Sequence, residues 1–179
     1  ALDTQAGQFT GKIRKSLKWS MAQKTAEGMS LTEAFKKLRT CNYAGVEPSL
    51  LGHVTQENAA EWIAASEASG LIIDGTVGGR TEGLEAGIDL TKKLGAESML
   101  LVINYSKDQP LQKTWTEAVA RMKDAATHAE KQGIKVLIEN VWSTFLISAF
   151  DMARFIDEVG SPWVQVHFDI GNMMRWGIA

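Results

Sequence analysis

Two segments decide the fold: Ile134–Asn140 (IKVLIEN) and Trp163–Asp169 (WVQVHFD). Each is a strand-like run of apolar residues that ends on a carboxylate and is followed by a loop or a helical pattern. If both strands belong to one parallel sheet, Glu139 and Asp169 emerge at the same edge. Two neighbouring carboxylates repel each other unless a cation lies between them, and a hard divalent metal ion is the usual solution. The pair therefore predicts half of a metal site.

Strand-like runs recur along the whole chain, at intervals of about 26 to 36 residues, which is the length of one strand plus one return helix. Two segments, 30–33 and 148–151, carry helix-start signals, and glycines precede most strands, where helices end. This spacing predicts a parallel α/β architecture. The expected strands begin near Ile13, Gly45, Leu71, Ser98, Ile134 and Trp163.

Polar residues alternate with apolar residues within these strands, whereas a sheet covered on both faces would be apolar almost throughout. In the sixth strand, Gln165, His167 and Asp169 share one face. A closed barrel whose inner face becomes polar toward one mouth explains this alternation better than an open sheet, and eight-stranded barrels carry their active sites at that mouth. Applied to every strand, the same parity predicts a ring of residues at the mouth: Lys18, Glu47, Asp74, Asn104, Glu139 and Asp169. Each of these residues taken alone could instead be a helix cap or a solvated strand end.

Composition is that of a single domain of 179 residues with a substantial core, since 45% of the residues are hydrophobic and 22% are charged. A net charge of −2 argues against nucleic acid or an anionic membrane as partner. The single cysteine, Cys41, cannot form an intrachain disulfide and is expected to be buried. No run is long enough for a membrane span. The compartment stays open between the cytoplasm and export after removal of a signal peptide.

Other common sites are excluded by their missing motifs. The segment after the first strand, Lys18–Met21, lacks the glycines that a nucleotide-binding loop needs. No serine lies on a glycine-flanked turn, and one cysteine cannot build a zinc site of paired thiolates. His167 shares the face of Asp169 one step deeper in the strand. It is either an ordinary interior histidine or a residue that supports the metal ligands from behind.

Several segments resemble the xylose isomerase-like TIM-barrel family, which includes sugar phosphate isomerases and epimerases, hydroxypyruvate isomerases, ketose 3-epimerases and, more distantly, endonuclease IV. The resemblance extends over nearly the whole chain and implies a (β/α)8 TIM barrel, of which about six βα units are present. The segments that carry it are 15–21 (KSLKWSM), 45–47 (GVE), 138–142 (IENVW), 153–158 (ARFIDE) and 168–172 (FDIGN).

The resemblance implies a divalent metal held by Glu139 from the fifth strand and Asp169 from the sixth, with a His and a Glu from strands seven and eight. These last two ligands have no counterpart here. Residues 1–179 are therefore expected to be a single barrel domain that is incomplete at the C-terminus, with the protein continuing beyond Ala179. Residues are also expected to be missing from short loops at 79–81 and 105–111.

The implied function is a metal-dependent isomerase or epimerase in carbohydrate metabolism, acting on a sugar or small hydroxy-carbonyl compound through an enediolate. Mn or Mg is expected, with Zn or Co as further options. Glu139 is expected to be both metal ligand and proton acceptor. Expected substrate contacts are Lys18, Glu47, Trp142 and Asn172, although Trp142 could equally be packing. Asn172 stands where several ketose epimerases carry a histidine, so no particular sugar is implied.

Two alternatives stay open on the same barrel. One is a metal-dependent hydrolase or lyase, such as an endonuclease IV-like phosphodiesterase or a polyol dehydratase, although the three histidines of the chain make the nuclease the weaker choice. The other is a non-catalytic sugar-binding barrel. The expected partner is a small, sugar-like substrate, with no nucleic acid and no membrane, and a homo-oligomer is one option for the assembly.

Overall fold

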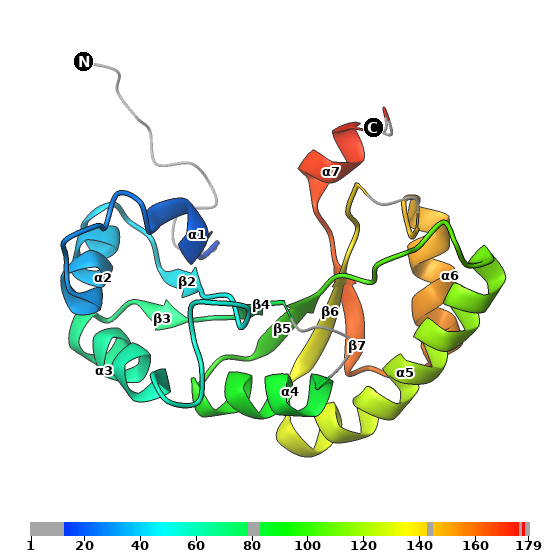
Figure 1. The fold of residues 1–179 in the computed structure, drawn as a ribbon. Coiled ribbons are helices and arrows are strands. Elements are labelled where there is room, and N and C mark those ends of the chain that lie inside the picture. Colours follow the sequence, from blue (N-terminus) through cyan, green and yellow to red (C-terminus); the bar gives the residue numbers. More distant parts are fainter. Residues whose placement is uncertain (1–12, 79–82, 143–144, 176, 178–179) are drawn as a thin grey trace.

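The chain alternates short parallel strands with helices in a computed structural model that describes residues 13–78, 83–142, 145–175 and 177 (Figure 1). The strands are β1 (Ser16–Lys18), β2 (Gly45–Glu47), β3 (Ile72–Ile73), β4 (Thr76–Val77), β5 (Ser98–Leu101), β6 (Lys135–Glu139) and β7 (Val164–His167). The helices are α1 (Trp19–Ala22), α2 (Leu31–Thr40), α3 (Ala59–Ser69), α4 (Leu84–Lys93), α5 (Leu111–Gln132), α6 (Ala149–Val159) and α7 (Ile170–Arg175). This order confirms the predicted α/β architecture.

The third predicted strand is divided between two sheets. β3 pairs with β2 in a sheet of order β1-β2-β3, whereas β4 pairs with β5 in a sheet of order β4-β5-β6-β7. Asp74 and Gly75 lie at the break. The strand predicted to begin near Leu71 is therefore β3, and the separate strand β4 was not predicted. The first strand also begins later than expected, at Ser16, because Ile13 lies outside it and is 65% exposed.

The predicted alternation of apolar and polar faces holds in β1, β6 and β7, whereas β5 (SMLL) is apolar after its first residue. Val46, Ile73, Val136 and Ile138 are buried on the outer face, which the helices α2 to α6 cover. The opposite, inner face carries the polar set. Register places Lys18 beside Glu47 on neighbouring strands and Glu139 beside His167.

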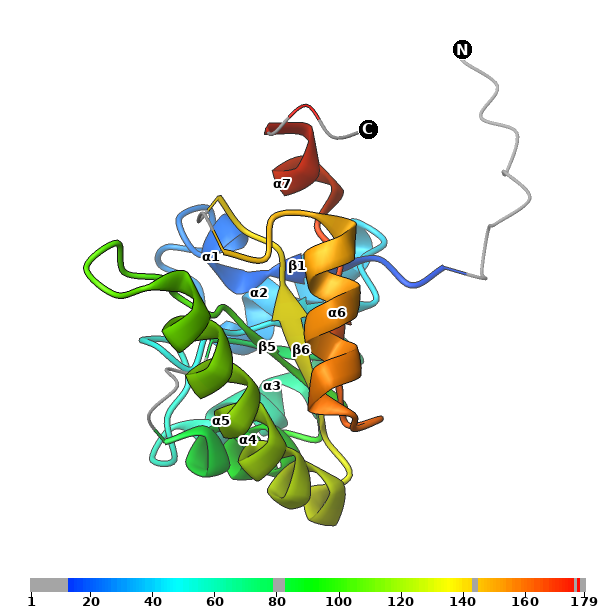
Figure 2. The same ribbon diagram turned by 90° about the vertical axis from the view of Figure 1, so that its right-hand side faces the viewer.

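Two hydrophobic clusters form the core between the strands and the helices. One lies under α2 and α3, where the rings of Trp19, Phe35 and Trp62 pack edge to face with centroids 5.6 to 5.8 Å apart. The other lies under α4, α5 and α6, where Trp115 packs against Phe155 at 5.5 Å. Figure 2 shows α5 and α6 along the same side of the sheet.

Helix boundaries follow the sequence signals. Ser30 and Ser148 each form a capping box, with Glu33 and Asp151 respectively, so both predicted helix starts are confirmed. Gly133 ends the 22-residue α5 with a φ of 70°, a conformation that side-chain-bearing residues rarely adopt.

The strands form an arc in Figure 1, with the C-terminal ends of β6 and β7 on the side where α7 begins. Within the described residues, β1 pairs with β2 alone and β7 with β6 alone. The structure is thus a partial barrel, and the prediction of a barrel with about six βα units is confirmed. In the described ranges, no helix has the length and apolar character that a bilayer crossing needs.

Candidate metal and substrate site

Glu139 is the centre of the polar inner face. It ends β6, and its side chain is 7% exposed. The Nζ atom of Lys18, which ends β1, lies 3.5 Å from Glu139 Oε1. Since β1 and β6 belong to different sheets, this ion pair crosses the inner face of the arc. A buried carboxylate needs such a partner, because burial without a cation is costly.

Glu47 lies close enough to these groups for its charge to be affected by them. Burial raises the pKa of Glu47 first of all, and the carboxylates of Asp74 and Glu139 raise it further, whereas Lys18 opposes the shift. Gly75, at the break between β3 and β4, leaves room for this side chain, because a Cβ there would lie 3.1 Å from Glu47 Oε1. The predicted proximity of Lys18, Glu47 and Glu139 is therefore confirmed.

Asp169 follows β7 and is fixed by Asn140, which sequence reasoning had not singled out. The Asn140 side chain is bonded to both backbone groups of Asp169: its Nδ2 donates to the carbonyl oxygen at 2.9 Å, and its Oδ1 accepts from the N–H at 2.7 Å. Asn140 is only 2% exposed, so these bonds are sheltered from water. The sequence signal that could have identified Asn140 is its position directly after Glu139.

The carboxylate of Asp169 also caps α7. Its Oδ1 accepts a hydrogen bond from the Asn172 N–H at 2.7 Å, which is the geometry of a helix N-cap. The sequence left open that a strand-end acid could be a helix cap, and Asp169 does cap α7. Gly171 gives the carboxylate space, since a Cβ there would lie 3.2 Å from Oδ1.

His167 is half-buried between the two proposed ligands. Burial lowers the pKa of His167, and the ammonium of Lys18 lowers it too, while the carboxylates of Glu139 and Asp169 act in the opposite direction. The neutral imidazole is thus favoured in the folded protein. This position agrees with a supporting role, and that role stays a prediction.

Asp74 and Asn104 do not lie where the ring prediction placed their side chains. The Asp74 carboxylate accepts a hydrogen bond from Ser16 Oγ at 2.6 Å, so it is held beside the residue two positions before Lys18 on β1, although it still raises the pKa of Glu47. The contact passes over Gly45, where a Cβ would lie 2.8 Å from both partners. Asn104 is exposed, beyond the end of β5, and lines a small polar hollow with Gln109. The ring therefore narrows to the four residues Lys18, Glu47, Glu139 and Asp169.

Trp142 and Asn172, the other expected substrate contacts, already have protein partners. The Trp142 ring is 57% exposed and stacks under the Arg175 guanidinium, which lies 4.2 Å from its centroid. The Asn172 Nδ2 donates to the Asn140 carbonyl at 2.8 Å. Both residues thus lie at the rim around Asp169, and their contact with substrate stays a prediction.

Glu139 and Asp169 fit a divalent cation in their chemistry, because carboxylate oxygens are the ligands that hard cations take. The ammonium at Glu139 shows that positive charge is already favoured there. In the ranges that the structure describes, no three His, Cys, Asp or Glu side chains gather closely enough to hold a metal ion. Glu139 and Asp169 are thus candidate ligands, and their binding of a metal ion stays a prediction.

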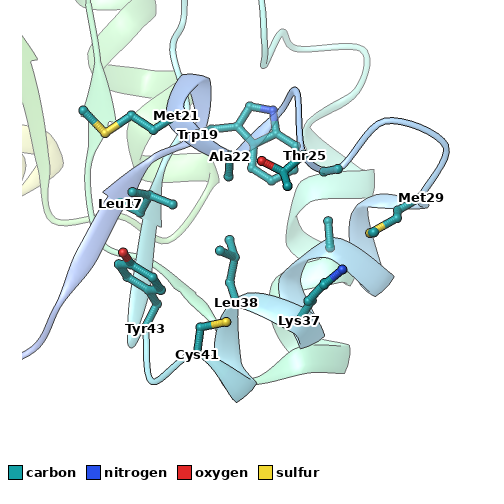
Figure 3. A pocket seen from close by; sticks show the side chains of 12 residues that line it. Leu17, Trp19, Met21, Ala22, Thr25, Met29, Lys37, Leu38, Cys41 and Tyr43 are labelled. Atoms are coloured by element: carbon teal, nitrogen blue, oxygen red, sulfur yellow. The ribbon is translucent and has the colours of Figure 1, made fainter.

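A separate apolar pocket of about 280 Å³ lies between the β1–α1 segment and α2 (Figure 3). Leu17, Leu38 and Tyr43 are among its lining residues. Cys41 is exposed at this pocket, so the prediction that it is buried was wrong. Cys41 directly follows the last residue of α2, whereas the residues of α2 that are buried in the core are Ala34 and Phe35. None of the four ring residues lines this pocket.

Comparison with known proteins places this geometry in context. A family model described as "Xylose isomerase-like TIM barrel" matches residues 35–178. No curated protein sequence matches significantly. Among solved structures, the IOLI protein with a bound zinc atom is 11% identical and covers 93% of this chain and 66% of its own, with a TM-score of 0.77.

Two epimerase structures are also similar. L-Ribulose 3-epimerase is 18% identical, with 90% of this chain and 62% of that chain covered and a TM-score of 0.74. The 3-keto-D-glucoside 4-epimerase YcjR from E. coli, in its apo form, is 16% identical, with 81% and 65% covered and a TM-score of 0.72. At these identities the likeness shows the fold, and the chain spans about two thirds of each relative. Because the family model matches most of its length, the chain belongs to the xylose isomerase-like TIM barrel family.

Proposed function

We propose that this chain carries part of the active site of a divalent-metal-dependent isomerase or epimerase that acts on a sugar or small hydroxy-carbonyl compound. The observation that carries the proposal is the buried carboxylate of Glu139 at the mouth, together with Asp169, which Asn140 holds just beyond the end of the next strand. The epimerase activities named for two similar structures, and the zinc atom in a third, support it.

Glu139 and Asp169 would hold the metal ion, which when bound supplies Lewis-acid polarisation of a carbonyl and a neighbouring hydroxyl. The residues of the chain do the rest. Glu139 accepts the proton of the carbon beside the carbonyl. In an isomerisation, Glu139 would return the proton to the adjacent carbon. In an epimerisation, a second acid on the opposite face, expected from the eighth strand, would deliver a proton to the same carbon while Glu139 keeps the one it removed.

Lys18, Glu47 and Asn172 surround this centre and are proposed to bind substrate hydroxyl groups. Glu47, with its raised pKa, is suited to donate a hydrogen bond when protonated and to accept one when ionised. Trp142, exposed beneath Arg175, offers an aromatic face at the rim. His167 is proposed to support Glu139 from the facing position on β7, two residues before Asp169.

Solvent exchange tests this function. The complete protein, loaded with Mn²⁺, is incubated with a panel of ketoses in deuterated water, and deuterium at the carbon beside the carbonyl is measured by NMR. We expect incorporation with at least one ketose, and a loss of about 100-fold or more in Glu139→Gln. Glu97→Gln, at the opposite end of the sheet, is the matched control and should exchange normally. Neither exchange nor isomerisation with any ketose would contradict the proposal.

A further inference from the structure

Lys18 stands beside Glu139 where a bound cation would have to approach it. The lysine reaches this carboxylate from β1, across the inner face, rather than from a strand that is hydrogen-bonded to β6. Its Nζ lies 3.5 Å from Oε1, and its side chain is 31% exposed whereas that of Glu139 is 7% exposed. The buried charge is therefore neutralised by a cation that keeps contact with solvent.

The surrounding charges make this ammonium exchangeable. Lys18 also acts on Glu47 and His167, and Glu139 acts on the same two groups. A flexible four-carbon stem lets an ammonium leave one carboxylate for another without any backbone movement. A metal ion at Glu139 would repel the ammonium at such a distance, because two positive charges would then lie close together beside one carboxylate.

We propose that Lys18 is the exchangeable counter-ion of the metal site: it neutralises Glu139 until a divalent cation binds, and is then displaced toward the mouth, where it is free to contact substrate. This inference rests on the proposed function. Lys18 thus has two successive positions, one beside Glu139 and one nearer the mouth. Metal binding becomes a competition between the lysine ammonium and the divalent cation for the Glu139 carboxylate. Removing the lysine charge should therefore strengthen metal binding.

Calorimetric titration with Mn²⁺ alone, on the complete protein, tests the competition. We expect Lys18→Met to bind Mn²⁺ about tenfold more tightly than the wild type, and Lys18→Arg to bind no more tightly than the wild type. Lys135→Met is the matched control, because Lys135 lies on the same strand as Glu139 but about 13 Å earlier along it. It should change the affinity by less than about twofold.

The outcomes separate the two proposals. Equal or weaker binding by Lys18→Met, with normal binding by the wild type, overturns the counter-ion role and leaves the proposed function standing. Absence of Mn²⁺ binding by the wild type and by Lys18→Met overturns both.

A measurement on the wild type avoids any folding defect of the variants. The rate of lysine acetylation is followed by peptide mass spectrometry with and without saturating Mn²⁺. We expect labelling of Lys18 to rise several-fold with metal, and labelling of Lys135 to stay constant. An unchanged rate at Lys18 with metal demonstrably bound would overturn the inference.

Discussion

Asn140 holds Asp169 by both of its backbone polar groups, with bonds of 2.9 Å to the carbonyl oxygen and 2.7 Å from the N–H. The residue directly after one proposed metal ligand therefore sets the position of the other. This couples the ends of β6 and β7 at the point where the two carboxylates must converge. We call this pair of hydrogen bonds the Asn140 clamp. Its loss should disturb the site although both carboxylates stay in the chain.

Asn140→Ala should lower the free energy of unfolding by about 2 kcal/mol, because it leaves two sheltered backbone groups of Asp169 without their partner. Urea denaturation measures this change, and Mn²⁺ titration of the same variant should show weaker binding. Asn104→Ala removes an exposed asparagine from the neighbouring rim and should alter the stability by less than about 0.5 kcal/mol. Equal effects of the two changes would argue against the clamp.

The two roles of Asp169 can be separated by substitution. Asp169→Asn keeps an oxygen that can accept from the Asn172 N–H, so the α7 cap and the stability should be retained. The lost charge should nevertheless weaken Mn²⁺ binding by at least tenfold. Asp169→Ala should lose both, with a stability cost of about 1 kcal/mol. Unchanged metal affinity in Asp169→Asn would leave Asp169 as a helix cap and nothing more.

Gly45 is required by the contact between Ser16 and Asp74. A Cβ at this position would lie 2.8 Å from both side chains, so Gly45→Ala should destabilise the protein by about 1 to 3 kcal/mol. The same substitution in an Asp74→Ala background should cost less, because one obstructing side chain is gone. A double-mutant cycle of urea denaturation curves measures the difference. Additive costs would show that the crowding is not at Asp74.

Glu47 should make stability fall with rising pH. Burial and the neighbouring carboxylates raise its pKa above the ordinary 4.5, so folding favours its protonated form. The associated stability is complete below pH 4.5 and is lost as pH rises through the raised pKa. The free energy of unfolding of Glu47→Gln minus that of the wild type should therefore increase between about pH 4 and pH 8.

Denaturation midpoints across this pH range check the sign. Glu57→Gln serves as the control, because hydrogen bonding from Thr55 lowers the pKa of Glu57. Its linkage therefore has the opposite sign and lies mainly below pH 4.5, so its difference should stay nearly flat above that pH. A difference for Glu47→Gln that stays flat or falls as pH rises would contradict the crowded environment described for Glu47.

Local patterns predicted the features that depend on nearby residues. The predicted helix starts at Ser30 and Ser148 and the predicted helix end at Gly133 were all confirmed. Each of them depends only on residues within one helical turn. Strand parity placed Lys18, Glu47 and Glu139 on one face, because alternation along a strand needs no knowledge of the partner strand.

The features that sequence reasoning missed are tertiary. Asp74, at the break between β3 and β4, is bonded to Ser16, 58 positions away, and no local propensity signals this contact. The clamp of Asn140 on Asp169 joins residues 29 positions apart. Parity could put Lys18 and Glu139 at the same mouth, but their ion pair joins two different sheets, and alternation along single strands does not specify which strands face each other.

Anomalous diffraction from crystals of the complete protein grown with Mn²⁺ tests the central claim most directly, namely that Glu139 and Asp169 hold a divalent metal. We predict an anomalous peak about 2.1 Å from a carboxylate oxygen of each residue, with the Lys18 ammonium moved away from Glu139. A map without a peak at these carboxylates, with Lys18 still paired to Glu139, would contradict the account.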